Sequence, residues 1–101
     1  MTGKSQERTK DDVLRATVIV GNVRGIHARA AAKIVKLAGT FAARVTVTKD
    51  GETVGADSIL GLLMLAATPG TQLELAATGR EAARAMDAMV SLLSRGDMGE
   101  L

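Results

Sequence analysis

The chain has 101 residues, 47% of them hydrophobic, with a formal net charge of +2, one histidine and no cysteine. This length predicts one domain with an ordinary hydrophobic core. The absence of cysteine excludes disulfides, zinc–thiolate sites and thiol nucleophiles, and with a single histidine no dedicated transition-metal site is expected. We expect no signal peptide in the polar first residues and no transmembrane segment, which needs ~18 apolar residues. A cytoplasmic protein without membrane association is therefore predicted.

Charge is distributed unevenly along the chain. Residues 13–49 contain seven basic side chains and no acidic one, whereas residues 50–101 contain eight acidic and three basic ones. This asymmetry could attract an acidic partner or a phosphate, although solvated charges on separate elements explain it equally well. Nucleic acid is not expected, because the basic residues are spread out and Phe41 is the only aromatic side chain for base stacking.

The first half of the chain predicts a leader, a strand, a loop and a helix. Residues 1–13 are expected to be disordered, and residues 15–20 alternate apolar and polar side chains, which is typical of a strand. After a loop over 21–25, small and apolar residues at helical spacing predict a helix over 28–38, which ends at Gly39. The buried face of this helix should comprise Ala31, Ile34, Val35 and Ala38.

A hairpin and a short helix follow. Residues 41–48 alternate cleanly, and Asp50-Gly51 predicts a tight turn into a short strand over 52–54. The next run, residues 57–65, is apolar around most of its circumference but spans only about two turns. Such a helix cannot bury every side, so part of its apolar surface should be exposed as a docking surface, although a fully buried helix is the open alternative. We expect some of Ile59, Leu60 and Leu63 to be exposed.

The last elements are a strand and a long helix. Residues 72–77 alternate again, and Thr78 and Glu81 have the spacing of a capping box that would open a helix ending near Ser94. Residues 97–101 are expected to be frayed, which leaves a domain over 14–96.

The element order is βαββαβα. Each helix has one apolar face and each strand alternates, which predicts an α+β domain with one mainly antiparallel four-stranded sheet. Three helices should cover one face of this sheet and leave the other face open to water.

The single histidine, His27, lies at the predicted start of the helix over 28–38, two residues before Arg29. Helix N-termini present N–H groups without intrahelical acceptors and a partial positive charge, and both favour an anion. A lone imidazole beside them suits the holding of a phosphoryl group. An ordinary loop or cap histidine is the alternative that the residues leave open.

Two motifs make the chain resemble the HPr family, the phosphocarriers of the bacterial phosphoenolpyruvate-dependent phosphotransferase system. Gly25-Ile26-His27-Ala28-Arg29-Ala30-Ala31 resembles the active-site signature, and Asp57-Ser58-Ile59-Leu60-Gly61 resembles the second family motif at the expected distance. The element order is also similar to the HPr open-faced β-sandwich. The run over residues 58–65 is more similar to the nitrogen-related branch of the family than to the sugar-transport branch.

The resemblance implies a carrier that is not itself an enzyme and needs no cofactor or metal. Phospho-Enzyme I would transfer its phosphoryl group to Nδ1 of His27, which would donate it to a histidine of an EIIA-type protein. The backbone N–H of Ala28 and the guanidinium of Arg29 would hold the phosphate oxygens. We expect a monomer.

The resemblance also implies a regulatory site, and basic residues near a short apolar helix suggest a partner surface. Ser58 aligns with the serine that HPr kinase/phosphorylase modifies in some members; it could equally be a simple helix N-cap. Partner contacts are expected from Lys33 and Lys36 together with Ile59, Leu60 and Leu63. The family usually has proline where this chain has Ala30, and the helix should still begin beside His27.

Two other classes of protein stay open at this point. One is a regulatory HPr-like module that binds partners without transferring phosphate, which the presence of His27 disfavours. The other is an unrelated small α+β ligand-binding or scaffold domain. Incubation with phosphoenolpyruvate, magnesium and Enzyme I separates them, because only a carrier gains acid-labile phosphate on histidine.

Overall fold

Alternation of apolar and polar residues produces the central strands of the sheet. Along β2 (Leu14–Ile19) every other residue is buried. β2 pairs with β5 (Gln72–Thr78), β5 with β3 (Arg44–Lys49), and β3 with β4 (Glu52–Gly55), and every pair is antiparallel. The predicted four-stranded antiparallel sheet is therefore confirmed.

A short edge strand extends this sheet. The structure is a computed structural model, and it describes residues 7–8 and 12–95. β1 (Glu7–Arg8) pairs with β2, so the strand order is β1-β2-β5-β3-β4. β1 was not expected from the sequence. Most of the predicted disordered leader, and all of the predicted frayed segment over 97–101, lie outside the described residues.

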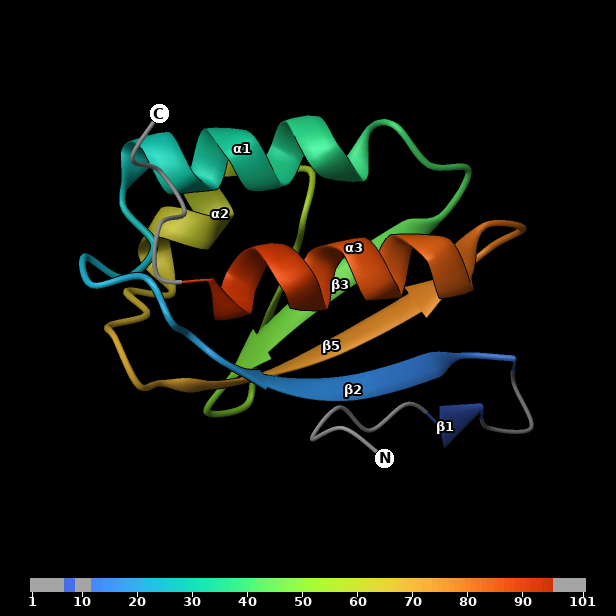
Figure 1. Cartoon of the computed structure of the whole chain (residues 1–101), viewed down its shortest axis with the longest axis horizontal. Coiled ribbons are helices and arrows are strands. Elements are labelled where there is room, and N and C mark those ends of the chain that lie inside the picture. Colours follow the sequence, from blue (N-terminus) through green and yellow to red (C-terminus); the bar gives the residue numbers. More distant parts are fainter. Residues whose placement is uncertain (1–6, 9–11, 96–101) are drawn as a thin grey trace.

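In the described part of the chain, three helices cover one face of the sheet, as predicted (Figure 1). α3 (Ala82–Ser94) packs against β2 and β5, and α1 (Ala28–Ala38) contacts both α3 and the short α2 (Ile59–Met64). None of the helices in the described part of the chain is long and apolar enough to cross a membrane.

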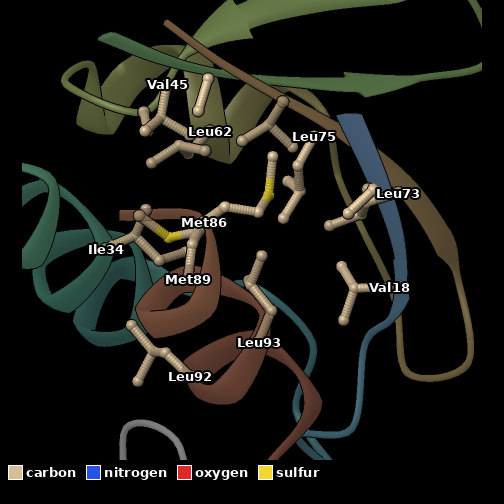
Figure 2. Packing of buried hydrophobic residues seen from close by; sticks show 14 of the residues in the cluster. Val18, Ile34, Val45, Leu62, Leu73, Leu75, Met86, Met89, Leu92 and Leu93 are labelled. Carbon is tan, nitrogen blue, oxygen red and sulfur yellow. The ribbon is translucent and has the colours of Figure 1, made fainter. Parts of the chain in front are cut away.

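The core lies between the helices and the covered face of the sheet. Figure 2 shows side chains of α1, α2 and α3 directed toward those of the strands. Burial of these aliphatic and thioether side chains supplies the main favourable term in folding, about 1.5–3 kcal/mol for each large one. The largest fully buried side chains of the core are Ile34, Leu62, Leu73, Leu75, Met86, Met89 and Leu93.

The hairpin between β3 and β4 turns as its sequence predicts. Asp50 and Gly51 have φ angles of 51° and 85°, both in the left-handed region. Two consecutive residues in this region are what a two-residue turn needs to match the twist of its strands. Asp and Gly are among the residues that adopt this conformation most readily.

The expected capping box before α3 is wrong. The helix begins at Ala82 with Glu81 as its N-cap, and β5 continues through Thr78. The backbone N–H of Ala42 donates to Oε1 of Glu81 at 2.8 Å, and the N–H of Glu81 donates to the carbonyl of Ala42 at 2.9 Å. These two bonds hold the loop before β3, so Glu81 is unavailable to Thr78. They also explain why β3 begins at Arg44 and not at Phe41.

Candidate functional site

The loop from Val20 to His27 is held by backbone hydrogen bonds on two sides. The N–H of Val20 donates to the carbonyl of Thr71 at 2.9 Å, and the N–H of Ile26 donates to the carbonyl of Ala67 at 3.0 Å. On the other side, the N–H of Gly21 donates to the carbonyl of Leu93 at the end of α3, at 3.0 Å. The position of the histidine is thus set by the α2–β5 loop and by α3.

Gly25 permits the close approach of this loop to the α2–β5 connection. Its φ of +67° lies in the left-handed region. A Cβ atom built on it would lie 2.3 Å from the carbonyl oxygen of Ala67, a separation that no real side chain accepts. Glycine is therefore required here by backbone conformation and by space.

Asn22 closes the turn inside the loop. It is fully buried, and its side-chain Nδ2 donates to the backbone carbonyl of Gly25 at 2.8 Å. The backbone carbonyl of Asn22 in turn accepts the N–H of Gly25 at 2.9 Å. The burial of Asn22 was not expected from the sequence. An asparagine in a glycine-containing loop is an ordinary turn residue, so no local signal distinguishes a buried asparagine from an exposed one.

His27 is the N-cap of α1, as its place in the sequence predicts. Its backbone is extended (φ −96°, ψ −176°), and its carbonyl accepts the first intrahelical bond, from the N–H of Ala31 at 2.8 Å. The side chain makes no capping hydrogen bond. The residue is half-buried, and within the described part of the chain its Nε2 is buried without a hydrogen-bond partner.

The first turn of α1 is electropositive. It contains Arg29 and no acidic residue, and both Ala28 and Arg29 are exposed. Ala30, where the family usually has proline, is fully buried in the same turn, and the helix still begins beside His27 as expected. The N–H groups of a first turn have no acceptor within the helix, so this end of α1 can bind an anion through backbone and side chain together.

Ser58 is the N-cap of α2. Its Oγ accepts the backbone N–H of Gly61 at 2.9 Å. The interpretation of Ser58 as a helix cap is therefore confirmed, and its modification stays a prediction.

The prediction that part of the apolar surface of α2 is exposed is confirmed. Ile59 and Leu60 are 43% and 68% exposed, while Leu63 is half-buried and packs against the core. Met64, whose exposure was not predicted, is 73% exposed. It lies four residues after Leu60, and this spacing brings the two side chains to the same helix face.

The two lysines expected on the partner surface lie toward a different neighbour. Lys33 and Lys36 line a groove of about 490 Å³ that runs between α1 and residues of α3, among them Leu92. Both lysines therefore lie beside α3 along this groove. The short helix lies instead beside the first turns of α1, at the end of the molecule that holds the loop before His27 (Figure 1).

Comparison with known proteins agrees with this fold. A family model described as the PTS HPr component phosphorylation site matches residues 14–95. The chain is 42% identical over 80 residues to the phosphocarrier protein HPr of Cupriavidus necator. The aligned region covers 79% of this chain and 89% of that protein. It is 39% identical to the phosphocarrier protein NPr of Shewanella violacea, over 79% of this chain and 88% of that protein.

A solved structure agrees with the same assignment. The crystal structure of HPr from Bacillus anthracis superposes with a TM-score of 0.76 at 34% identity, over 78% of this chain and 94% of that chain.

An open-faced antiparallel sheet with a lone histidine at a helix start is thus the architecture of a small phosphocarrier of the phosphotransferase system. The chain belongs to the HPr family. Both HPr and NPr proteins occur among its relatives at similar identity, so the finer assignment to the nitrogen-related branch stays a prediction.

Proposed function

We propose that His27 accepts a phosphoryl group from phospho-Enzyme I and passes it to a histidine of an EIIA-type protein. The observation that supports this most directly is the position of the only histidine of the chain at the start of α1, with Arg29 in the same turn. The carrier itself uses no metal or cofactor. The cytoplasmic location and the monomeric state expected from the sequence stay predictions.

Nδ1 is the proposed acceptor atom. Nε2 of His27 is buried, and the residue as a whole is only half-buried, so the accessible part of the side chain lies elsewhere. An incoming phosphorus atom would have to displace packed atoms to reach Nε2. Attack through the other ring nitrogen avoids this displacement.

The first turn of α1 would hold the phosphate. The N–H of Ala28 and the guanidinium of Arg29 can donate charge-assisted hydrogen bonds to its oxygens, and the helix end adds a partial positive charge. These interactions are made by groups that need little rearrangement. Transfer between the two proteins then depends mainly on positioning and on charge neutralisation.

The docking surface is proposed to centre on α2. Ile59, Leu60 and Met64 expose apolar side chains beside the first turns of α1, and Val23 in the loop before His27 is 71% exposed. Exposed apolar groups around a reactive residue are typical of a protein-binding surface. Lys33 and Lys36 would contribute charge at its edge and no central contact.

Ser58 is proposed as a regulatory site for a kinase of the HPr kinase/phosphorylase type. Phosphorylation would add a charge of about −1.5 to −2 immediately before the exposed face of α2. Because that face is the proposed docking surface, the added charge would oppose binding of an acidic or apolar partner surface.

The deciding experiment is phosphorylation by Enzyme I with phosphoenolpyruvate and magnesium. His27→Ala should gain no acid-labile phosphate and should keep its circular dichroism spectrum. Arg29→Ala should be phosphorylated about tenfold to a hundredfold more slowly, because a hydrogen bond to a charged group contributes about 1.5–3 kcal/mol.

Arg15→Ala is the matched control, since this arginine is exposed on β2, on the face opposite the helices, and its removal should leave the rate unchanged. Undiminished acid-labile phosphate in His27→Ala would contradict the proposal. A wild-type protein that binds Enzyme I without being labelled would instead favour the regulatory module.

A further inference from the structure

Two buried polar atoms in the loop before α1 have no hydrogen-bond partner within the described residues. They are Oδ1 of Asn22 and Nε2 of His27. Buried polar groups are normally paired, so each such atom calls for an explanation. Both atoms occur in one loop, next to the proposed site of phosphorylation. This suggests a common explanation for the two.

The chemical identity of the Asn22 atom is defined by its neighbour. The other atom of the same amide bonds to the carbonyl oxygen of Gly25 at 2.8 Å, and only an NH₂ group can donate there. The unpaired atom is consequently the carbonyl oxygen, which can only accept. Its amide already reaches the residue two positions before His27, so it lies at the base of the segment that presents the imidazole.

The second atom is a donor when the ring is ready to react. Attack by Nδ1 requires a lone pair on that nitrogen, and a neutral imidazole then has its proton on Nε2. This step depends on the function proposed above. The unphosphorylated ring therefore has a buried N–H without an acceptor, close in the chain to a buried acceptor without a donor.

We infer that Asn22 is a positioning residue whose Oδ1 accepts the Nε2–H of His27 when the ring turns toward it, both before and during phosphoryl transfer. The His27 side chain makes no capping bond, so no hydrogen bond to the helix start has to break when the ring turns toward the amide. The pairing keeps the reactive tautomer and orients the ring, as partners of functional histidines do elsewhere.

The bonds and charges in this step balance. The Nδ1 lone pair of His27 forms the new N–P bond, while the bond from phosphorus to the donor protein breaks and its electron pair stays with the donor. Nε2 keeps its proton throughout. The positive charge that develops on the ring is stabilised by the carbonyl dipole of Asn22.

Two substitutions separate positioning from simple support of the loop. Asn22→Leu and Asn22→Asp both remove the NH₂ group that bonds to Gly25, but only the aspartate retains an oxygen acceptor. Single-turnover phosphorylation by Enzyme I should be about tenfold slower in Asn22→Leu and within about threefold of wild type in Asn22→Asp. The ¹⁵N shifts of the His27 ring should show the Nε2–H tautomer in wild type and in Asn22→Asp, and a shift toward Nδ1–H in Asn22→Leu.

Equal slowing in the two variants with unchanged ring shifts would overturn the inference, because loss of the Gly25 bond alone would then explain the effect. If Asn22→Leu fails to fold, the inference is tested on wild type and Asn22→Asp by the rate at which the Nε2 proton exchanges with solvent. This exchange must be slow in both proteins. Rapid exchange in both overturns the inference. Wild-type protein that takes up no phosphate on His27 defeats the proposed function, and the ring shifts of the unphosphorylated variants still test Asn22 separately.

Discussion

The same hydroxyl oxygen of Ser58 caps a helix and would carry the regulatory phosphate. Its Oγ accepts the N–H of Gly61 and so caps α2, and a phosphate on that oxygen would replace a neutral acceptor by a charged one. The cap and the added charge are separate physical effects, and they are separable by substitution because aspartate caps a helix about as well as serine does.

Of two Ser58 variants, one should therefore change only the stability and the other only the rate of phosphorylation. Ser58→Ala should lower the free energy of unfolding by ~1 kcal/mol through loss of the cap and leave phosphorylation of His27 unchanged. Ser58→Asp should keep the stability, as urea unfolding would measure, and slow phosphorylation by Enzyme I.

Ala83→Asp adds the same charge on the exposed surface of the first turn of α3 and should not affect the rate. If Ser58→Asp is phosphorylated as fast as wild type, Ser58 acts as a cap and nothing more.

At the scale of single elements, the helices and strands were largely predictable from the sequence. The α1 bounds agree with the predicted helix over 28–38 because its apolar spacing and its flanking residues all indicate the same limits. The start of α3 was not predictable, since Glu81 bonds to Ala42, and a contact between residues so far apart in sequence has no local signal. Asn22 was missed for a related reason, because its burial depends on how the loop folds back.

The loop before α1 offers a test of how element geometry controls the site. Gly25→Ala would put a Cβ against the carbonyl of Ala67, whereas Gly51→Ala in the β-hairpin has no atom within 4 Å of its new Cβ. Both glycines have positive φ, so each substitution pays about 1–2 kcal/mol for the left-handed conformation.

Thermal unfolding should show a clearly greater loss for Gly25→Ala, and only this variant should be phosphorylated more slowly on His27. Equal losses and equal rates in the two variants would mean that the loop tolerates displacement from Ala67.

Across the whole molecule, the core, the solvent-exposed face of the sheet and the proposed docking surface lie in three different places. The covered face holds the core, and the open face presents residues such as Arg15, Thr17 and Ile19 to solvent. The proposed docking residues lie instead with the helices, around the loop before His27. The sequence could predict exposed apolar residues in α2, because so short a helix cannot hide them all, but it could not predict that Lys33 and Lys36 lie toward α3.

Leu60 and Ile19 allow the docking surface to be tested with a matched control. Both are exposed apolar side chains, at 68% and 51%, but Leu60 lies on α2 and Ile19 on the open face of the sheet. Leu60→Ser should weaken binding of Enzyme I by about tenfold, corresponding to about 1.4 kcal/mol, as expected for an apolar anchor. Ile19→Ser should not change it.

Because neither side chain is buried, both variants should unfold within about 0.5 kcal/mol of wild type. Isothermal titration calorimetry with Enzyme I measures the affinities, and chemical-shift changes in the labelled carrier identify the surface. Loss of affinity in Ile19→Ser, with shift changes confined to the strands, would assign docking to the open face. The exposed apolar side chains of α2 would then need another partner.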